Sequence, residues 1–291
     1  MTEGQKNDHI TACQAGRDFL LHELGKHVQP DTAEAILSHY LDVADTAHTP
    51  KAIETIYFKM LQSAQNANMM ANVIGGTIGG IENLGEAVFG FKPREVANAF
   101  ATDHERLFSH IRKTLKPTGK LLGGNRSLWP RYCRTVLSSA AYLAQFKDGE
   151  DFNCWANHLY RDSRSKPALP LLISQEVFGF GYPLACDFLK ELGFIDYGKP
   201  DVHIKRILMA LGFVQGGASD YETQKAIAHI ATDSGMSAYS VDKLFWLIGS
   251  GKFYDHRKLG KDGRIGRNYL QFIRDTAPRM SWWDEQTRVI C

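Results

Sequence analysis

The sequence lacks any apolar run long enough to cross a membrane. No stretch of the 291 residues approaches the roughly 18 consecutive apolar residues that a membrane-spanning helix needs. The first residues, from Met1 to Gly16, are polar and lack the basic-then-apolar order of a secretory signal. We therefore expect a cytoplasmic protein with no membrane partner.

Cysteine is scarce and scattered. The five cysteines stand at positions 13, 133, 154, 186 and 291, an odd number with no close spacing. A disulfide framework needs paired cysteines, and a zinc site needs Cys or His pairs at short, fixed separations. The eleven histidines are dispersed as well. The pattern favours free thiols in a reducing compartment and predicts no metal site.

Alternation of polar and apolar residues, which marks β-strands, is absent, and no internal repeat is visible. Apolar residues recur instead at helical spacing. The expected helices cover residues 32–45, 51–63, 129–146, 151–161, 184–192, 202–211, 220–231 and 240–248. Ser240 is the expected N-cap of the last one, and a loop is expected at 75–80. With 44% hydrophobic residues, the chain can bury a full core, and we expect an all-α fold.

Acidic residues are missing from one long stretch. Residues 112–134 contain no Asp or Glu, and their seven basic residues are Arg112, Lys113, Lys116, Lys120, Arg126, Arg131 and Arg134. A second stretch, 252–274, holds seven Lys or Arg against two Asp, although the net charge of the chain is only +2. A solvated surface would explain a single basic run equally well. Two runs favour contacts with nucleic-acid phosphates, for which we single out Arg126 and Arg131.

The segment from Val177 to Leu208 carries the most specific pattern. It predicts a helix, a tight Gly179-Phe180-Gly181 turn, a second helix, a loop, and an Asp201-Val202-His203 entry into a third helix. The turn leaves amide N–H groups at the start of the second helix, where an anion such as a phosphate can bind. A carboxylate at Asp201 is held on rigid backbone at the head of the third helix.

These residues resemble the helix-hairpin-helix DNA glycosylases, the superfamily of endonuclease III, the adenine glycosylase MutY and 8-oxoguanine glycosylase. The shared pattern is Gly-apolar-Gly followed, about twenty residues later, by Asp-x-His. Two further segments are similar to the family, residues 60–66 (MLQSAQN) and residues 239–249 (YSVDKLFWLIG). The three matches stand in the family order and span residues from about 55 to 250.

The resemblance implies two helical subdomains with the active cleft between them. Residues 51–200 would form a bundle that carries the hairpin, and residues 1–50 would join 201–291 in the other. It also implies a monomer that binds double-stranded DNA containing a modified base. One departure is the long segment from Ser63 to Gly179, which is either a packing elaboration or an extra wall for an unusual base.

By this resemblance Asp201 is the catalytic residue, which stabilises positive charge on the sugar and positions water for attack. Its simpler role is as N-cap of the following helix, and both roles can hold together. Family members with lyase activity carry a lysine where this chain has Pro183, and proline offers no amine nucleophile. A monofunctional glycosylase without lyase activity is therefore expected, and Lys190 on the same helix is expected to be a solvated surface charge.

Cofactors and DNA contacts follow from the same comparison. The four clustered cysteines that bind an iron–sulfur cluster in some members are missing, so we expect no such cluster. A monovalent cation on the hairpin carbonyls is implied only by resemblance. Base flipping needs a residue that fills the gap in the duplex, and Gln65 with Asn66 occupies the matching helix end. Phe180 and the two hairpin glycines, with His203, complete the predicted DNA-binding set.

The sequence leaves several functions open. The damaged base is not specified, and the long insertion would suit a roomy pocket for a bulky modified cytosine, which would place the protein in phage defence instead of DNA repair. A non-catalytic DNA-binding protein that keeps the hairpin is the rival from another class. A bifunctional glycosylase with a relocated lysine is the third alternative.

Overall fold

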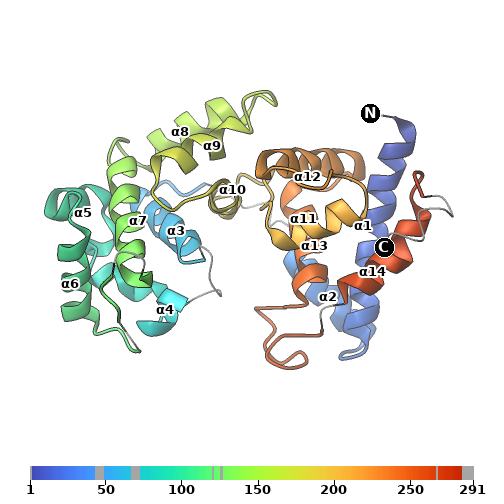
Figure 1. Cartoon of the computed structure of the whole chain (residues 1–291), viewed down its shortest axis with the longest axis horizontal. Helices are drawn as coiled ribbons and strands as arrows, with labels where there is room; N and C mark the ends of the chain where they lie inside the picture. The colour runs from blue at the N-terminus through green and yellow to red at the C-terminus, as the bar shows by residue number, and fades with distance from the viewer. Residues whose placement is uncertain are drawn as a thin grey trace. The chain divides into compact units, whose positions relative to one another are not determined.

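The computed structural model describes residues 2–42, 49–66, 73–119, 121–124, 127–266 and 268–283. Within these residues the chain forms helices and turns, with isolated bridges but no strand (Figure 1). The predicted all-α class is thus confirmed. None of the helices in the described ranges is long and apolar enough to span a membrane.

The chain divides into two compact units, and the first is built from both ends of the sequence. It comprises Met1–Ala47 and Ile195–Cys291, where the sequence analysis placed the limits at 50 and 201. Its helices are α1 (Glu3–Gly25), α2 (Pro30–Leu41), α11 (Val202–Ala210), α12 (Asp220–Ser234), α13 (Ala238–Ser250), α14 (Tyr269–Thr276) and the 3₁₀ turn η3 (Ala277–Arg279).

Helix α13 is the centre of this unit. Nearly all of its residues are buried, and α1, α2, α11 and α12 pack around it (Figure 1). A helix that buries residues on every side needs neighbouring helices all around it. Its N-cap is Ser237, not Ser240 as predicted. Ser240 lies inside the helix and donates a hydrogen bond of 2.6 Å to the Leu41 carbonyl, so it fastens α13 to the end of α2.

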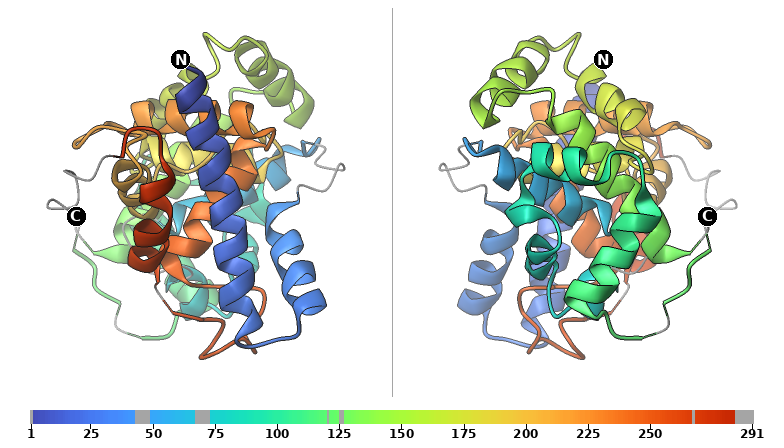
Figure 2. Two further views of the ribbon diagram at one scale, coloured as in Figure 1. Left: turned by 90° about the vertical axis from the view of Figure 1, so that its right-hand side faces the viewer. Right: turned by 90° about the vertical axis from the view of Figure 1, so that its left-hand side faces the viewer.

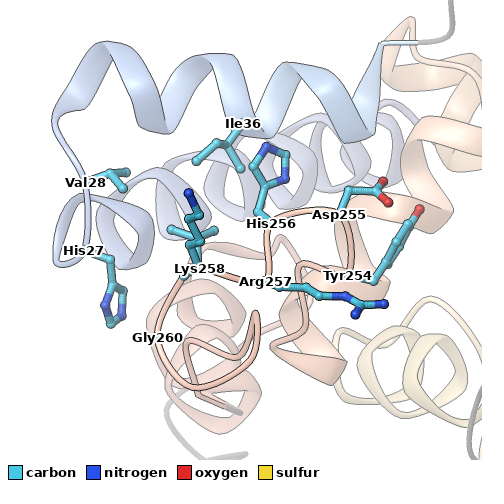
Figure 3. Close-up of a pocket in the computed structure, with 10 residues that line it drawn as sticks. His27, Val28, Ile36, Tyr254, Asp255, His256, Arg257, Lys258 and Gly260 are labelled. Atoms are coloured by element: carbon cyan, nitrogen blue, oxygen red, sulfur yellow. The ribbon is translucent and has the colours of Figure 1, made fainter.

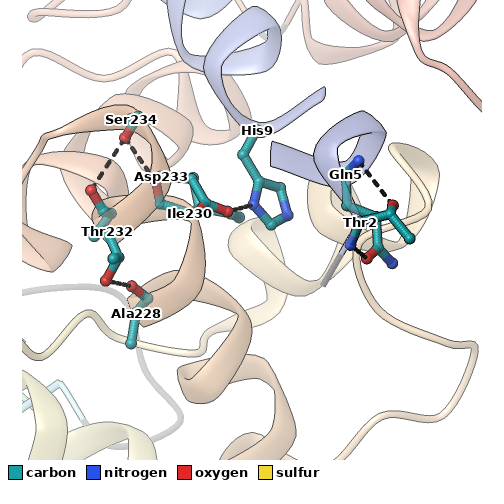
Figure 4. Close-up of polar contacts among 9 residues, drawn as sticks. Thr2, Gln5, His9, Ala228, Ile230, Thr232, Asp233 and Ser234 are labelled. Atoms are coloured by element: carbon teal, nitrogen blue, oxygen red, sulfur yellow. Dashed lines mark hydrogen bonds and ion pairs between the residues drawn. The ribbon is translucent and has the colours of Figure 1, made fainter. Parts of the chain in front are cut away.

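The long helix α1 is tied to this core by polar contacts as well as apolar ones. It begins with a capping box in which Thr2 and Gln5 exchange hydrogen bonds (Figure 4). The Nδ1 atom of His9 lies 2.6 Å from Oδ2 of Asp233 on α12, and both side chains are buried. The pair satisfies two polar groups that would otherwise be costly to bury.

The second unit comprises His48–Phe194. Its elements are α3 (Ile53–Ala64), α4 (Val73–Thr77), η1 (Ile81–Glu86), η2 (Phe89–Phe91), α5 (Pro93–Phe100), α6 (His104–Leu115), α7 (Leu128–Leu143), α8 (Gly149–Tyr160), α9 (Ala168–Glu176) and α10 (Tyr182–Glu191). The prediction of a loop at 75–80 is partly wrong, because α4 extends to Thr77. Figure 2 shows the same helices from two further directions.

Helix α7 organises this second unit. It packs against α3, α5, α6 and α9. Two buried tyrosine hydroxyls fasten it to α3, because Tyr57 donates to the Val136 carbonyl (2.8 Å) and Tyr132 donates to the Leu61 carbonyl (2.9 Å). Burial raises the pKa of both phenols well above the ordinary value, so they remain hydrogen-bond donors at any physiological pH.

Candidate functional site

The predicted hairpin is a tight turn between α9 and α10 in the second unit. The N–H of Phe180 donates to the Val177 carbonyl (3.1 Å), which closes the turn. Gly179 has φ +73°, a left-handed conformation that favours glycine. Gly181 has φ −69° and is the N-cap of α10, so its own conformation does not demand glycine. The expectation that the turn requires glycine for its backbone conformation therefore holds at Gly179 only.

The hairpin exposes backbone donors. Gly179 and Gly181 are exposed, and within the described residues neither backbone N–H donates a hydrogen bond. The N–H groups at the start of a helix carry partial positive charge and bind anions readily. The turn therefore offers two main-chain donors to a phosphate.

The Phe180 side chain cannot take part in such binding. It is 1% exposed and packs on Phe188, with ring centroids 6.1 Å apart. The ring belongs to the core beneath the turn, and the N–H of this residue is used within the turn, so Phe180 shapes the hairpin and its predicted contact with DNA stays a prediction. A cation at the hairpin stays a prediction: the carbonyls of Val177 and Gly181 both accept backbone N–H groups.

An arginine missing from the predicted set lies directly beside the turn. The guanidinium carbon of Arg134, on α7, lies 3.7 Å from the ring centroid of Phe178, the residue before Gly179. Ser138, one turn further along α7, accepts the Phe178 N–H (2.9 Å). The Thr135 hydroxyl would lie 3.2 Å from a Cβ at position 179. Helix α7 thus braces the hairpin and presents an exposed, stacked arginine next to its free amides.

The structure says less about the two arginines that the sequence predicts to contact DNA phosphates. Arg131 lies on the same helix as Arg134 and is exposed. Arg126 lies outside the described residues. The 112–134 stretch therefore contributes at least two exposed arginines to one helix, and the contact between Arg134 and Phe178 distinguishes one of them.

Gln65 is not presented at the surface. Its side chain is 1% exposed, and its Oε1 accepts a hydrogen bond of 3.1 Å from the Gly75 N–H. The neighbouring Asn66 is only partly exposed. A side chain that fills a gap in DNA must reach out of the protein, so the predicted role of Gln65 would require this hydrogen bond to break.

Lys190 is also placed differently from the prediction. The sequence suggests a solvated charge, but the residue is 6% exposed and its Nζ lies 3.2 Å from Oδ1 of Asp187. Burial of a lysine is tolerated when a carboxylate compensates the charge. Pro183 occupies the first turn of α10, where its missing N–H costs nothing.

Asp201 is the N-cap of α11 in the first unit, as predicted for its simpler role. Its Oδ1 accepts the N–H groups of His203 (2.8 Å) and Ile204 (3.1 Å). Its Oδ2 accepts no hydrogen bond from the described part of the chain. One oxygen therefore fixes the carboxylate, and the other is left for a ligand or water.

The surroundings of Asp201 raise its pKa. Burial is the largest cause, and the negative charge of Asp242 is the second, while the Ile204 N–H, Lys199 and His203 act in the opposite direction. A raised pKa makes the carboxylate a stronger base, which suits proton transfer from water.

Asp242 is a residue that the sequence analysis missed. It is 1% exposed on α13, and a Cβ at Gly198 would lie 3.0 Å from its Cβ. Only glycine lets the loop before Asp201 approach α13 so closely. An acidic residue in the 241–248 run, which is apolar apart from Asp242 and Lys243, was a signal that could have identified it.

His203 is half-buried, and its ring lies edge-on to Trp246 with centroids 6.5 Å apart. Its backbone N–H binds Asp201. No group of three or more His, Cys, Asp or Glu that could hold a metal ion occurs in the described ranges.

Comparisons with known proteins give two similar solved structures. No family model and no curated protein matches the chain. It is similar to an 8-oxoguanine glycosylase/lyase of Methanocaldococcus jannaschii in complex with a 15mer DNA containing 8-oxoguanine, with 14% identity, 81% of this chain and 99% of that chain covered, and a TM-score of 0.48. It is also similar to the 8-oxoguanine DNA glycosylase of Thermotoga maritima, with 16% identity, the same coverage and a TM-score of 0.47.

Proposed function

We propose that this chain is a monofunctional DNA glycosylase that hydrolyses the bond between a sugar and a damaged or modified base. The observation that carries the proposal is the state of Asp201: one carboxylate oxygen is fixed by the N-terminus of α11, the other is open, and the pKa is raised by burial and by Asp242. A second oxygen without a hydrogen bond is ordinary for a capping aspartate, but a helix cap alone does not need burial beside a second carboxylate, which raises the pKa of Asp201.

The proposed reaction adds water across the C1′–N bond. As this bond lengthens, its electron pair moves to the leaving base, and the sugar gains oxocarbenium character. The Asp201 carboxylate stabilises this charge and accepts a proton from the water whose oxygen bonds to C1′. The leaving base takes a proton from solvent and departs as a neutral molecule, Asp201 returns its proton to solvent, and an abasic site remains. No cofactor takes part.

The hairpin supplies the DNA contacts in this proposal. The Gly179 and Gly181 amides bind a phosphate, and Arg134 adds a charge-assisted contact from α7. Strand cleavage would need an amine nucleophile, and Pro183 has none at the hairpin. The ion pair of Lys190 with Asp187 makes that lysine a poor substitute.

Incubation with a panel of duplexes tests this function. The panel contains 8-oxoguanine, alkylated purines, mispaired adenine and phage-derived DNA with bulky modified cytosines, and abasic sites are counted before and after alkali. Release from the modified phage DNA alone would assign the protein to phage defence. DNA binding without base release from any member of the panel would favour the non-catalytic alternative.

A further inference from the structure

The first unit contains a cavity of about 770 Å³ away from Asp201 in sequence. Its wall is formed by His27 and Val28, after α1, by Ile36 on α2, and by residues 254–260 of the loop that follows α13 (Figure 3). The volume lies in the range of small-molecule sites, roughly 300–1,000 Å³.

The loop that lines the cavity has a fixed backbone. Phe253 is fully buried, and its N–H donates to the Gly263 carbonyl (2.7 Å). The Ile265 N–H donates to the Gly251 carbonyl (3.1 Å), so the two ends of the loop are joined. Leu259 anchors the middle of the loop in the core. Side chains on such a loop are held ready for a ligand, which reduces the entropy lost on binding.

Tyr40 fixes the orientation of His256. The Tyr40 hydroxyl accepts the Asp255 N–H (2.8 Å) and also lies within hydrogen-bond distance of Nδ1 of His256 (3.2 Å). When the Tyr40 hydroxyl donates to Nδ1, the neutral ring carries its hydrogen on Nε2, which then acts as a donor. The Asp255 carboxylate is itself held by His39, whose Nε2 lies 3.2 Å from Oδ2.

The lining is therefore basic on one side. Arg257 and Lys258 pair with no carboxylate among the described residues, and the only acid in the wall is held by His39. Figure 3 shows Lys258 extending from the loop toward α2, and Arg257 extending toward Tyr254. His27 adds a further nitrogen group at the rim.

The remaining wall is apolar. The half-buried Val28 and Tyr254, which is 37% exposed, supply this apolar surface, because Ile36 and Leu259 are almost entirely buried. An inorganic phosphate would occupy only a small part of the cavity and would leave this surface unused. A ligand that combines an anion with a flat, weakly polar ring system matches both sides.

We propose that this cavity binds a nucleoside phosphate, with the phosphate on Lys258, Arg257 and His256 and the base against the exposed part of the Tyr254 ring (Figure 3). A free nucleotide and the terminal nucleotide of a DNA strand share this chemistry. The site does not depend on Asp201 or on the proposed base excision.

Calorimetry on the full chain with dAMP, deoxyadenosine and inorganic phosphate tests the site. Saturable binding of dAMP is expected, with each fragment weaker by about tenfold or more, because each makes only half of the contacts. Absence of dAMP binding, or equally tight binding of inorganic phosphate, would overturn the proposal. If a 5′-phosphorylated single strand competes with dAMP, the end of a DNA strand also binds in the cavity. If it does not compete, the cavity binds free nucleotides only.

Two charge reversals on the same loop provide the matched comparison. Lys258→Glu removes a lining cation, whereas Lys261→Glu makes the same change of net charge on an exposed lysine outside the lining. We expect about a tenfold or greater loss of dAMP affinity for the first and less than about a twofold loss for the second. Equal losses would show general attraction by a basic surface and would overturn the proposal. Thermal unfolding confirms that both variants are folded.

Discussion

Burial raises the pKa of Asp201 at the head of α11, and the buried carboxylate of Asp242 on α13 raises it further. The two residues are separated by 41 positions in the chain (242 − 201), and the loop containing Gly198 brings them into electrostatic contact. Because two neighbouring carboxylates resist simultaneous ionisation, Asp242 keeps Asp201 more basic than an exposed aspartate.

The first prediction follows from this relationship. Asp242→Asn removes a negative charge, so the pKa of Asp201 falls. Base release that requires ionised Asp201 declines below this pKa, and its acidic limb should therefore shift to lower pH in the variant. The pH profile of single-turnover base release measures the shift. Asp262→Asn, at an exposed position with φ +56° that asparagine tolerates, is the control and should leave the limb in place.

The two hairpin glycines should behave differently. Gly179→Ala forces a side chain into a left-handed conformation, at a cost of about 1 kcal/mol in unfolding free energy. Gly181→Ala should leave stability nearly unchanged, since φ is −69° there, but should weaken DNA binding if a phosphate approaches its amide. Denaturant unfolding and fluorescence anisotropy with a duplex separate the two effects. Unchanged DNA affinity in Gly181→Ala would contradict the proposed contact between a DNA phosphate and the Gly181 amide.

Arg134 should contribute one phosphate contact. Arg134→Ala is expected to lower DNA affinity and to reduce the slope of log affinity against log salt by about 0.9, as expected for one contact with duplex DNA. Arg106→Ala is the matched control, because Arg106 is also exposed and also stacks on a phenylalanine, Phe100, but lies on α6 outside the basic 112–134 stretch. The same change of slope in both variants would mean that Arg134 acts only through general charge.

The absence of an amine at position 183 leads to a prediction on strand cleavage. Borohydride should trap no covalent protein–DNA adduct during base release, because Pro183 cannot form a Schiff base. Denaturing gels of borohydride-treated reactions provide the measurement. Adduct formation at high yield would point to Lys190 or Lys199, and substitution of each lysine by alanine would identify the nucleophile.

Local sequence patterns predict the features that depend on neighbouring residues. The Asp201 cap needs only the residues of its own helix start, and the Gly179 turn needs only the adjacent backbone. Likewise, apolar spacing locates α13, although Ser237 replaces Ser240 as its cap because either serine satisfies the local pattern.

Burial depends on distant parts of the chain, so local sequence patterns predict poorly which side chains are buried. Phe180 and Lys190 look like exposed residues until the packing of α10 is known. Arg134 is one of seven cations in its stretch, and only the contact with Phe178 distinguishes it. Helix α1 is absent from the predicted ranges because its buried positions include small and polar residues, such as Asp8, His9 and Gly16.

The most direct test of the central claim compares the native chain with Asp201→Asn on the modified duplex that gives the highest base release. Asparagine is as good an N-cap as aspartate, so folding and DNA affinity should be retained while the charge on the second oxygen is lost. We expect alkali-labile abasic sites with the native chain and a loss of about 10²-fold or more in single-turnover rate for the variant. A rate within a few-fold of the native value would contradict this expectation and would leave Asp201 as a helix cap alone.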